Sequence, residues 1–214
     1  MKIRHHASSP ATAAFTLAEM LIVITIIGLL AAMTMQGYTY AMRSSKRRVT
    51  EASMTAIQSS LERYNDKYGE YPEPASPSET MQIMPNHIYN VAGSRCLYQA
   101  LTGDGHDAIK GGENGGGENG ASDGDFQDDE IQAVLFKDMP PAMKRVVSKM
   151  YLIVDGFSIP FQYMKATTDT TAEPVTVNPT YDIWSYGEDV EHTSSSSTDA
   201  QEKPAIAQKW IKNW

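Results

Sequence analysis

The sequence predicts an α+β fold in which one long N-terminal helix packs on a small C-terminal antiparallel sheet. Residues 15–35 form a run of 21 residues that is almost wholly apolar, and this is the length of helix that crosses a hydrocarbon core. Residues 54–68 carry an apolar stripe at helical spacing, and the last third of the chain holds three short segments rich in β-branched and aromatic residues. We therefore expect a helix with a membrane-spanning first half and an amphipathic second half, followed by a globular head.

The first 14 residues, MKIRHHASSPATAA, are short, polar and basic. They are similar to the start of a secretory signal, but in an ordinary signal peptide the small residues of the cleavage site follow the apolar region. Here Ala13 and Ala14 precede it. Cleavage after Ala14 would leave the apolar segment on the mature protein. We therefore expect residues 1–14 to be a cleaved leader and residues 15–35, about 31 Å of helix, to be a retained transmembrane anchor.

The helical pattern continues beyond the apolar run. No proline interrupts residues 15–68, and Gly69 followed by Pro72 provides a stop signal. The sequence therefore predicts a single stalk helix over residues 15–68. Its second half is amphipathic, because apolar residues recur there at spacings of three and four. The stripe consists of Met54, Ile57, Leu61, Tyr64 and Tyr68.

Residues 69–214 are expected to form the head that covers this stripe. A flexible loop is expected at residues 111–124, where GGENGGGENG repeats a pentapeptide of glycine and polar residues. Such a composition buries too little apolar surface to offset the entropy of ordering it. Helical structure is expected within residues 89–101 and at residues 128–136. The three predicted strands of the sheet are residues 151–154, 161–164 and 181–186.

The composition argues against nucleic-acid binding and against an enzyme. Residues 50–214 hold 12 basic and 25 acidic side chains, a balance of −13, which would repel a phosphate backbone. The sequence has no nucleophile motif, phosphate loop or metal-ligand spacing of the kind that enzymes use. Cys96 is the single cysteine, so the chain has no intramolecular disulfide. We expect a structural subunit without catalytic residues.

Residues 14–20, Ala-Phe-Thr-Leu-Ala-Glu-Met, lead into a helix rich in Ile, Leu and Val. This segment resembles the prepilin-peptidase motif of type IV pilins and type II secretion pseudopilins. The resemblance implies cleavage between Ala14 and Phe15, N-methylation of Phe15, and a role for Phe15 and Glu19 in fibre assembly. The residue before the cut is usually glycine in the family and is Ala14 here.

Glu19 is the one carboxylate inside the apolar run, and a charge in lipid needs a partner. After the predicted cut the α-ammonium group of Phe15 lies four residues from Glu19, one helical turn away on the same face. Within a filament Glu19 could instead meet the N-terminus of the next subunit, which would set the axial register. The alternative is a glutamate at the membrane boundary that extends to the lipid headgroups without a role in assembly.

Segments of the head are similar to the major pseudopilins of type II secretion, the protein G type. The first is the end of the predicted stalk, where LERYNDKYGEYPEP contains a Tyr-x-x-x-x-Gly-x-Tyr-Pro pattern. The others are VDGFSIPFQYM, YDIWSYGEDVE and the final WIKNW. The resemblance covers about two thirds of the chain, leaves out the Gly-rich insertion, and implies a pilin-like fold. The four segments are residues 61–74, 154–164, 181–191 and 210–214.

Proteins of this type bind calcium in the loop after a Ser-x-Gly-x-Asp segment, through carboxylates and carbonyl oxygens. The resemblance places Asp189 on the first carboxylate and Tyr186 on a carbonyl donor. The position of the second carboxylate is Trp210 here. The alternative is an exposed acidic loop that binds no metal. If a calcium site is kept, substitute carboxylates would come from Glu191, Asp199 or Glu202.

The function implied by resemblance is a structural subunit of a type II secretion pseudopilus, a homopolymer that drives protein export across the outer membrane. The implied partners are other pseudopilins, the inner-membrane assembly platform and the prepilin peptidase. The protein would be a single-pass inner-membrane protein with a periplasmic head, although counting the basic residues on either side of the span mildly favours a cytoplasmic head. The alternatives are a major or minor type IV pilin for adhesion, motility or DNA uptake, and a membrane-anchored binding module that does not polymerise.

Overall fold

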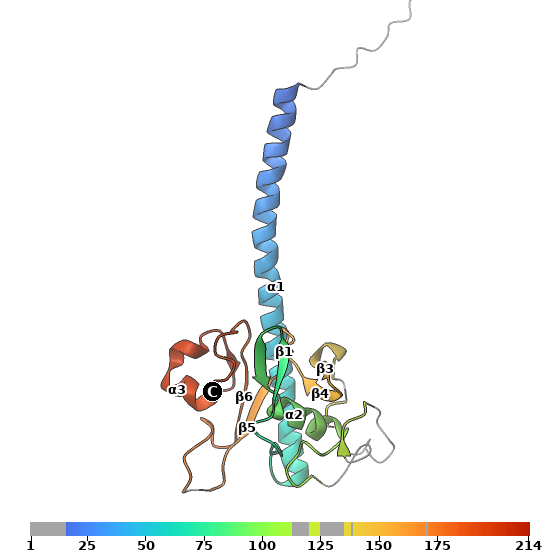
Figure 1. The fold of residues 1–214 in the computed structure, drawn as a ribbon, viewed down its shortest axis with the longest axis vertical. Coiled ribbons are helices and arrows are strands. Elements are labelled where there is room, and N and C mark those ends of the chain that lie inside the picture. The colour runs from blue at the N-terminus through green and yellow to red at the C-terminus, as the bar shows by residue number, and fades with distance from the viewer. Residues whose placement is uncertain (1–15, 113–119, 125–134, 138, 170) are drawn as a thin grey trace, which may run out of the picture. The chain divides into compact units, whose positions relative to one another are not determined.

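The structure, a computed structural model, describes residues 16–112, 120–124, 135–137, 139–169 and 171–214. Its first element is the helix α1 (Leu17–Tyr68), which contains 52 residues and is shown in Figure 1. Contacts divide the chain within this helix into two compact units, one ending at Arg43 and one beginning at Ser44. Short antiparallel strands follow α1, so the predicted α+β class is confirmed.

In the first unit, the apolar side chains of α1 are exposed. Leu21 and Leu30 are 58% and 57% exposed, and none of the residues 17–43 is buried. The hydroxyl groups of Thr25 and Thr34 donate hydrogen bonds to the carbonyl oxygens of Leu21 (2.7 Å) and Leu30 (2.8 Å). Because the helix satisfies these hydroxyls itself, they suit an apolar environment. Within the described part of the chain, α1 is the helix that is long and apolar enough to cross a membrane.

In the second unit, α1 contributes a buried stripe to the head. Met54, Ile57 and Leu61 are at most 5% exposed, and Tyr64 packs against the core that they join. The predicted stripe is confirmed over these four residues, but Tyr68 at its end is 47% exposed. The helix ends at Tyr68, and Gly69 follows in the left-handed region with φ of 80°. Glycine pays no steric cost there, so the predicted stop is confirmed.

Among the described residues, seven short strands form three antiparallel sheets. In the first sheet β1 (Thr80–Met84) pairs with β2 (His87–Asn90), and in the second β3 (Lys144–Val147) pairs with β4 (Met150–Ile153). The third sheet has the order β5 (Gln162–Lys165), β6 (Tyr181–Ser185), β7 (Ile211–Lys212). All five residues of the central strand β6 are buried, so both of its faces are covered by other parts of the head.

The longest helix of the head after α1 is α2 (Ala92–Thr102), which packs against β4 and β5. The packing is closest at Gly93, because a Cβ atom there would lie 2.6 Å from the backbone nitrogen and oxygen of Tyr163. Only glycine allows such an approach without a shift of the backbone. The shorter helices are η2 (Pro141–Met143), α3 (Ser197–Glu202) and η3 (Pro204–Ala207).

Two clusters of buried side chains form the core of the head. The first joins the stripe of α1 to α2, β4, β5 and β6. The second is rich in aromatic residues and contains Trp184, Tyr186 and Trp210. The ring of Trp210 lies nearly parallel to that of Trp184, with centroids 6.2 Å apart, and meets Tyr186 edge-on at 4.9 Å. These rings join β6 to the segment that precedes β7.

The pairing of the strands differs from the single three-stranded sheet that the sequence predicts. β4 pairs with β3, a strand that was not predicted. Toward β5, the carbonyl of Ile153 in β4 accepts one backbone hydrogen bond, from the amide of Phe161 (3.1 Å). Just outside the two strands, Val154 and Pro160 form an isolated bridge. Proline has no N–H to donate, so the ladder between the two strands does not extend.

Two other predictions are modified. Tyr89 belongs to β2, and the helix expected within residues 89–101 begins at Ala92. Most of the helix predicted at residues 128–136 lies outside the described residues. Of the Gly-rich loop at 111–124, the structure describes 111–112 and 120–124. The amides of His106 and Asp107 both donate to the carbonyl of Gly120 (2.7 and 3.0 Å), which attaches the second described part of the loop to residues that precede it.

Candidate functional site

The first candidate site is the start of α1. Ala14 and Phe15, on either side of the predicted cut, lie outside the described residues. Thr16 and Glu19 form a reciprocal capping box. The carboxylate of Glu19 accepts hydrogen bonds from the backbone N–H (2.9 Å) and the hydroxyl (2.8 Å) of Thr16, and the Thr16 hydroxyl accepts the backbone N–H of Glu19 (3.2 Å). This arrangement satisfies N–H groups that a helix leaves unpaired at its start.

The capping box gives Glu19 a partner within its own chain. The carboxylate is held at the first turn of α1, where the helix dipole favours negative charge. The structure thus brings Glu19 together with Thr16, while its pairing with the amine of Phe15 stays a prediction. Thr16 was not predicted as part of the site. A threonine three residues before a glutamate, at the start of an apolar run, is the sequence signature of this motif.

The second candidate site is the loop after β6, where calcium is expected from the family resemblance. Asp189 is 3% exposed. Its Oδ1 atom accepts the backbone N–H groups of Glu191 (2.9 Å) and His192 (3.2 Å). Its Oδ2 atom lies 3.0 Å from the indole Nε1 of Trp210, which donates to it, and 2.9 Å from Nδ1 of His192. Burial raises the pKa of Asp189, but these hydrogen bonds outweigh burial and hold the pKa below its usual value.

The residues predicted around Asp189 have other partners in the structure. The carbonyl of Tyr186 accepts the backbone N–H of Asp189 (3.0 Å), and its hydroxyl donates to the carbonyl of Ser195 (3.0 Å). The carboxylate of Asp199 caps α3, because it accepts the backbone N–H and the hydroxyl of Ser196, both at 2.8 Å. Ser196 in turn accepts the backbone N–H of Asp199 (3.1 Å), which makes a second capping box.

This set of residues does not fit calcium. The ion takes six to eight oxygen ligands, whereas all four acceptor positions of the Asp189 carboxylate face N–H groups or a ring nitrogen of the protein. Within the described ranges, no group of three or more His, Cys, Asp or Glu side chains could hold a metal ion. Asp189, Glu191 and Asp199 are therefore not brought into one ligand cluster.

The partners of Asp189 were not predicted from the sequence. Trp210 stands where a carboxylate was expected, and an indole N–H at such a position is a donor to an acidic group. His192 follows Asp189 by three residues, a spacing at which a short turn brings the two side chains together. Both residues could have been found by asking which donors satisfy a buried carboxylate.

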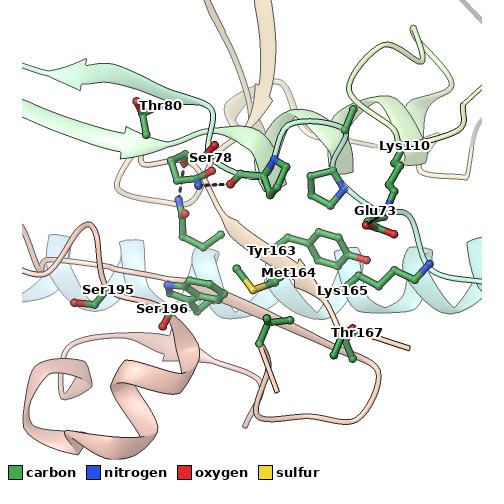
Figure 2. A pocket seen from close by; sticks show the side chains of 18 of the residues that line it. Glu73, Ser78, Thr80, Lys110, Tyr163, Met164, Lys165, Thr167, Ser195 and Ser196 are labelled. Carbon is green, nitrogen blue, oxygen red and sulfur yellow. Dashed lines mark hydrogen bonds and ion pairs between the residues drawn. The ribbon is translucent and has the colours of Figure 1, made fainter. Parts of the chain in front are cut away.

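A groove of about 870 Å³ borders the loop after β6 and lies between the segment that leads into β1 and the strand β5. Figure 2 shows Glu73, Lys110 and Lys165 toward one end and Ser195 and Ser196 at the other. The ammonium groups are paired, Lys110 with Glu73 (2.5 Å) and Lys165 with Glu70 (2.7 Å). The groove therefore presents hydroxyl groups and apolar side chains rather than unpaired cations.

Comparison with known proteins identifies the start of the chain. Residues 10–35 match the family model described as "Prokaryotic N-terminal methylation motif". No curated protein and no solved structure matches the chain. The match covers the predicted cleavage site, Glu19 and the apolar first part of α1. The chain thus carries the prepilin-type signal of type IV pilin-like proteins, which implies processing by a prepilin peptidase and association with a membrane.

Proposed function

We propose that this chain, which carries a prepilin-type signal, is a structural subunit of a type II secretion pseudopilus that polymerises through α1 to drive protein export across the outer membrane. The observation that carries the proposal is the coincidence of the methylation motif at residues 10–35 with the first part of α1, whose apolar side chains are exposed. Cleavage before an apolar segment retains that segment. The mature protein then has an anchor in the membrane that is also a surface for packing against copies of itself.

Whether α1 stays dispersed in the membrane or associates into a filament depends on helix packing and on polar contacts. Lipid tails are as apolar as leucine, so helices gain little hydrophobic free energy by leaving lipid for a bundle. Glu19 is the only Asp, Glu, Lys or Arg between residues 5 and 42. A contact made by this one carboxylate is therefore the natural determinant of assembly and of register.

Cleavage between Ala14 and Phe15 would create the partner that this contact needs. The new α-ammonium group on Phe15 would lie next to Thr16, whose backbone N–H and hydroxyl already bind Glu19. The carboxylate is thus held at the end of the helix where the amine appears. It can pair with the amine of its own chain in the membrane and with that of a neighbouring subunit in the filament.

The pseudopilus is favoured over a type IV pilus by the segments of the head that resemble major pseudopilins. A disulfide-closed C-terminal loop is frequent in type IV pilins, whereas Cys96 is the single cysteine here and is buried. Burial also raises the pKa of the Cys96 thiol, which keeps it unreactive. The proposed partners are further copies of the chain, other pseudopilins, the inner-membrane assembly platform and the prepilin peptidase, with the head in the periplasm.

Substitution of Glu19 tests the filament proposal. Glu19→Ala should insert into the membrane as the wild-type chain does, but filaments should fall by about tenfold or more, because about 1.4 kcal/mol per contact changes an association constant tenfold. Asp66→Ala, which removes an exposed carboxylate from the head part of the same helix, is the matched control and should assemble normally. Membrane insertion is measured by alkaline extraction and filaments by electron microscopy. Wild-type filament levels in Glu19→Ala would remove the assembly role of this residue.

Deletion of the gene distinguishes the system to which the subunit belongs. A subunit of a pseudopilus should be needed for the release of exported proteins, while motility and DNA uptake continue. Loss of motility or DNA uptake with normal export would assign the chain to a type IV pilus. Absence of filaments from cells that overproduce the wild-type chain would favour a binding module that does not polymerise.

A further inference from the structure

Two segments of the head meet at the buried carboxylate of Asp189. The backbone N–H of Asp189 closes a turn directly after β6, and the next residues, up to His192, fold back so that two backbone amides reach its Oδ1 atom. Trp210, 21 residues further along the chain, reaches its Oδ2 atom from the segment that leads into β7. The carboxylate therefore joins the loop after β6 to the strand β7.

The indole of Trp210 is held firmly in this position. Trp210 is 2% exposed, and its ring packs between Trp184 and Tyr186. The indole cannot leave Asp189 without opening the aromatic cluster. A cation that approached this carboxylate would have to displace a donor that the core fixes in place.

The segment that carries the Trp210 indole also has a cationic partner on α1. The guanidinium group of Arg47, on α1, lies 3.4 Å from the carbonyl oxygens of Lys209 and Trp210. Carboxylate and carbonyl oxygens are the ligands that calcium takes from proteins. In this head N–H groups of the chain bind both kinds of oxygen.

We propose that Asp189, Trp210 and Arg47 form a metal-independent lock, in which the indole and guanidinium N–H groups do the work that calcium is expected to do in the family that the head resembles. The lock orders the loop after β6 and attaches it to α1 without a bound ion. Stability of the head, and any assembly that depends on the head, then does not require calcium. This inference goes beyond the proposed function, since it holds whether or not the chain forms a filament.

The test uses the full chain in detergent micelles and follows thermal unfolding. The wild-type melting temperature should be the same in excess EDTA and in millimolar calcium, the range in which even weak extracellular calcium sites fill. A site that binds calcium in the folded state alone would raise the melting temperature as calcium is added. A melting temperature that is higher in calcium, or lower in EDTA, would overturn the proposal.

Two matched substitutions test the role of the indole. Trp210→Phe keeps an aromatic ring and removes the N–H group, which leaves a buried carboxylate oxygen short of a donor. Its melting temperature should fall by about 5 °C, and by the same amount in EDTA and in calcium. Trp214→Phe is the control, because the Trp214 indole nitrogen is also buried but has no hydrogen-bond partner among the described residues.

Comparison of the two melting temperatures decides whether the Trp210 N–H contributes to the lock. A clearly larger fall for Trp210→Phe than for Trp214→Phe supports it, and equal falls would contradict it. If Trp210→Phe does not fold, the wild-type comparison of EDTA with calcium still decides whether the head needs the ion. Neither measurement requires filaments, so failure of the lock would leave the filament proposal standing.

Discussion

Residues 17–43 and residues 44–68 belong to one helix, yet their apolar side chains have opposite surroundings. In the first segment Leu21 and Leu30 are more than half exposed, and in the second Ile57 and Leu61 are fully buried. The difference in burial follows from how apolar residues are distributed around the helix in each segment. The first segment is apolar on all sides and has no polar face to turn to water, while the second has one apolar stripe that a head of the same chain can cover. The first segment therefore needs an apolar environment from outside the chain.

The largest expected effect comes from removing a leucine on each side of this division. Leu61→Ala should lower the free energy of unfolding of the head by about 2–5 kcal/mol, because it opens a cavity in the core. Leu30→Ala should change it by less than about 0.5 kcal/mol. Denaturant unfolding in micelles, followed by tryptophan fluorescence, measures both, since all three tryptophans lie in the head. Equal losses would show that the two segments are not differently packed.

A second prediction concerns the pH dependence of stability that arises from the loop between β4 and β5. This loop contacts the buried part of α1. In this loop the N–H of Gly156 donates to the hydroxyl of Thr50 (3.0 Å). Burial raises the pKa of Asp155 from 3.8 to about 6, although hydrogen bonds from Ser185, Ile159 and Phe157 and the charge of Lys46 partly offset it. A folded pKa above the unfolded value means that the stabilising contribution is full below about pH 4 and is lost as the pH rises through about 6.

Asp155→Asn should remove this dependence. Between about pH 4 and pH 7 the wild-type chain should lose about 2 kcal/mol relative to the variant, because this interval covers most of the titration between the two pKa values. Urea unfolding of both proteins across this range provides the measurement. The subtraction cancels the carboxylates that the two proteins share. A constant difference between them would mean that Asp155 titrates normally in the folded head.

Substitution of one glycine in the head and one in the exposed part of α1 should give a smaller difference in stability. Gly93→Ala places a Cβ atom 2.6 Å from the backbone of Tyr163, so the head should lose about 1–3 kcal/mol of stability. Gly28→Ala meets nothing within 4 Å and should leave unfolding of the head unchanged. The same unfolding assay compares the two proteins. If Gly93→Ala leaves the free energy of unfolding of the head unchanged, α2 and β5 can move apart at little cost.

The parts of the fold that could be predicted are those that local sequence determines. The apolar run and the stripe through Leu61 predict α1, and Gly69 marks its end, because helices are built from contacts three and four residues apart. The strands β5 and β6 also follow from local composition. The capping box of Thr16 and Glu19 is just as local and could have been predicted by the same reasoning.

The other features depend on contacts that local sequence does not contain. Strand β7 has two residues and exists because β6 offers an edge to a segment some 26 residues further along the chain. The donors of Asp189 include Trp210, which only the folded chain brings near. A resemblance that suggests calcium cannot show that an indole has taken the place of a ligand. Such exchanges become visible only when each acceptor of the buried carboxylate is matched with its donor.

The proposed function requires that the exposed part of α1 stays on the mature protein after a leader is removed. Mass spectrometry of the N-terminal peptide of the protein isolated from membranes measures this directly. We expect a peptide that begins with N-methylated Phe15. An intact Met1, or an N-terminus beyond residue 33 as an ordinary signal peptide would leave, would contradict it.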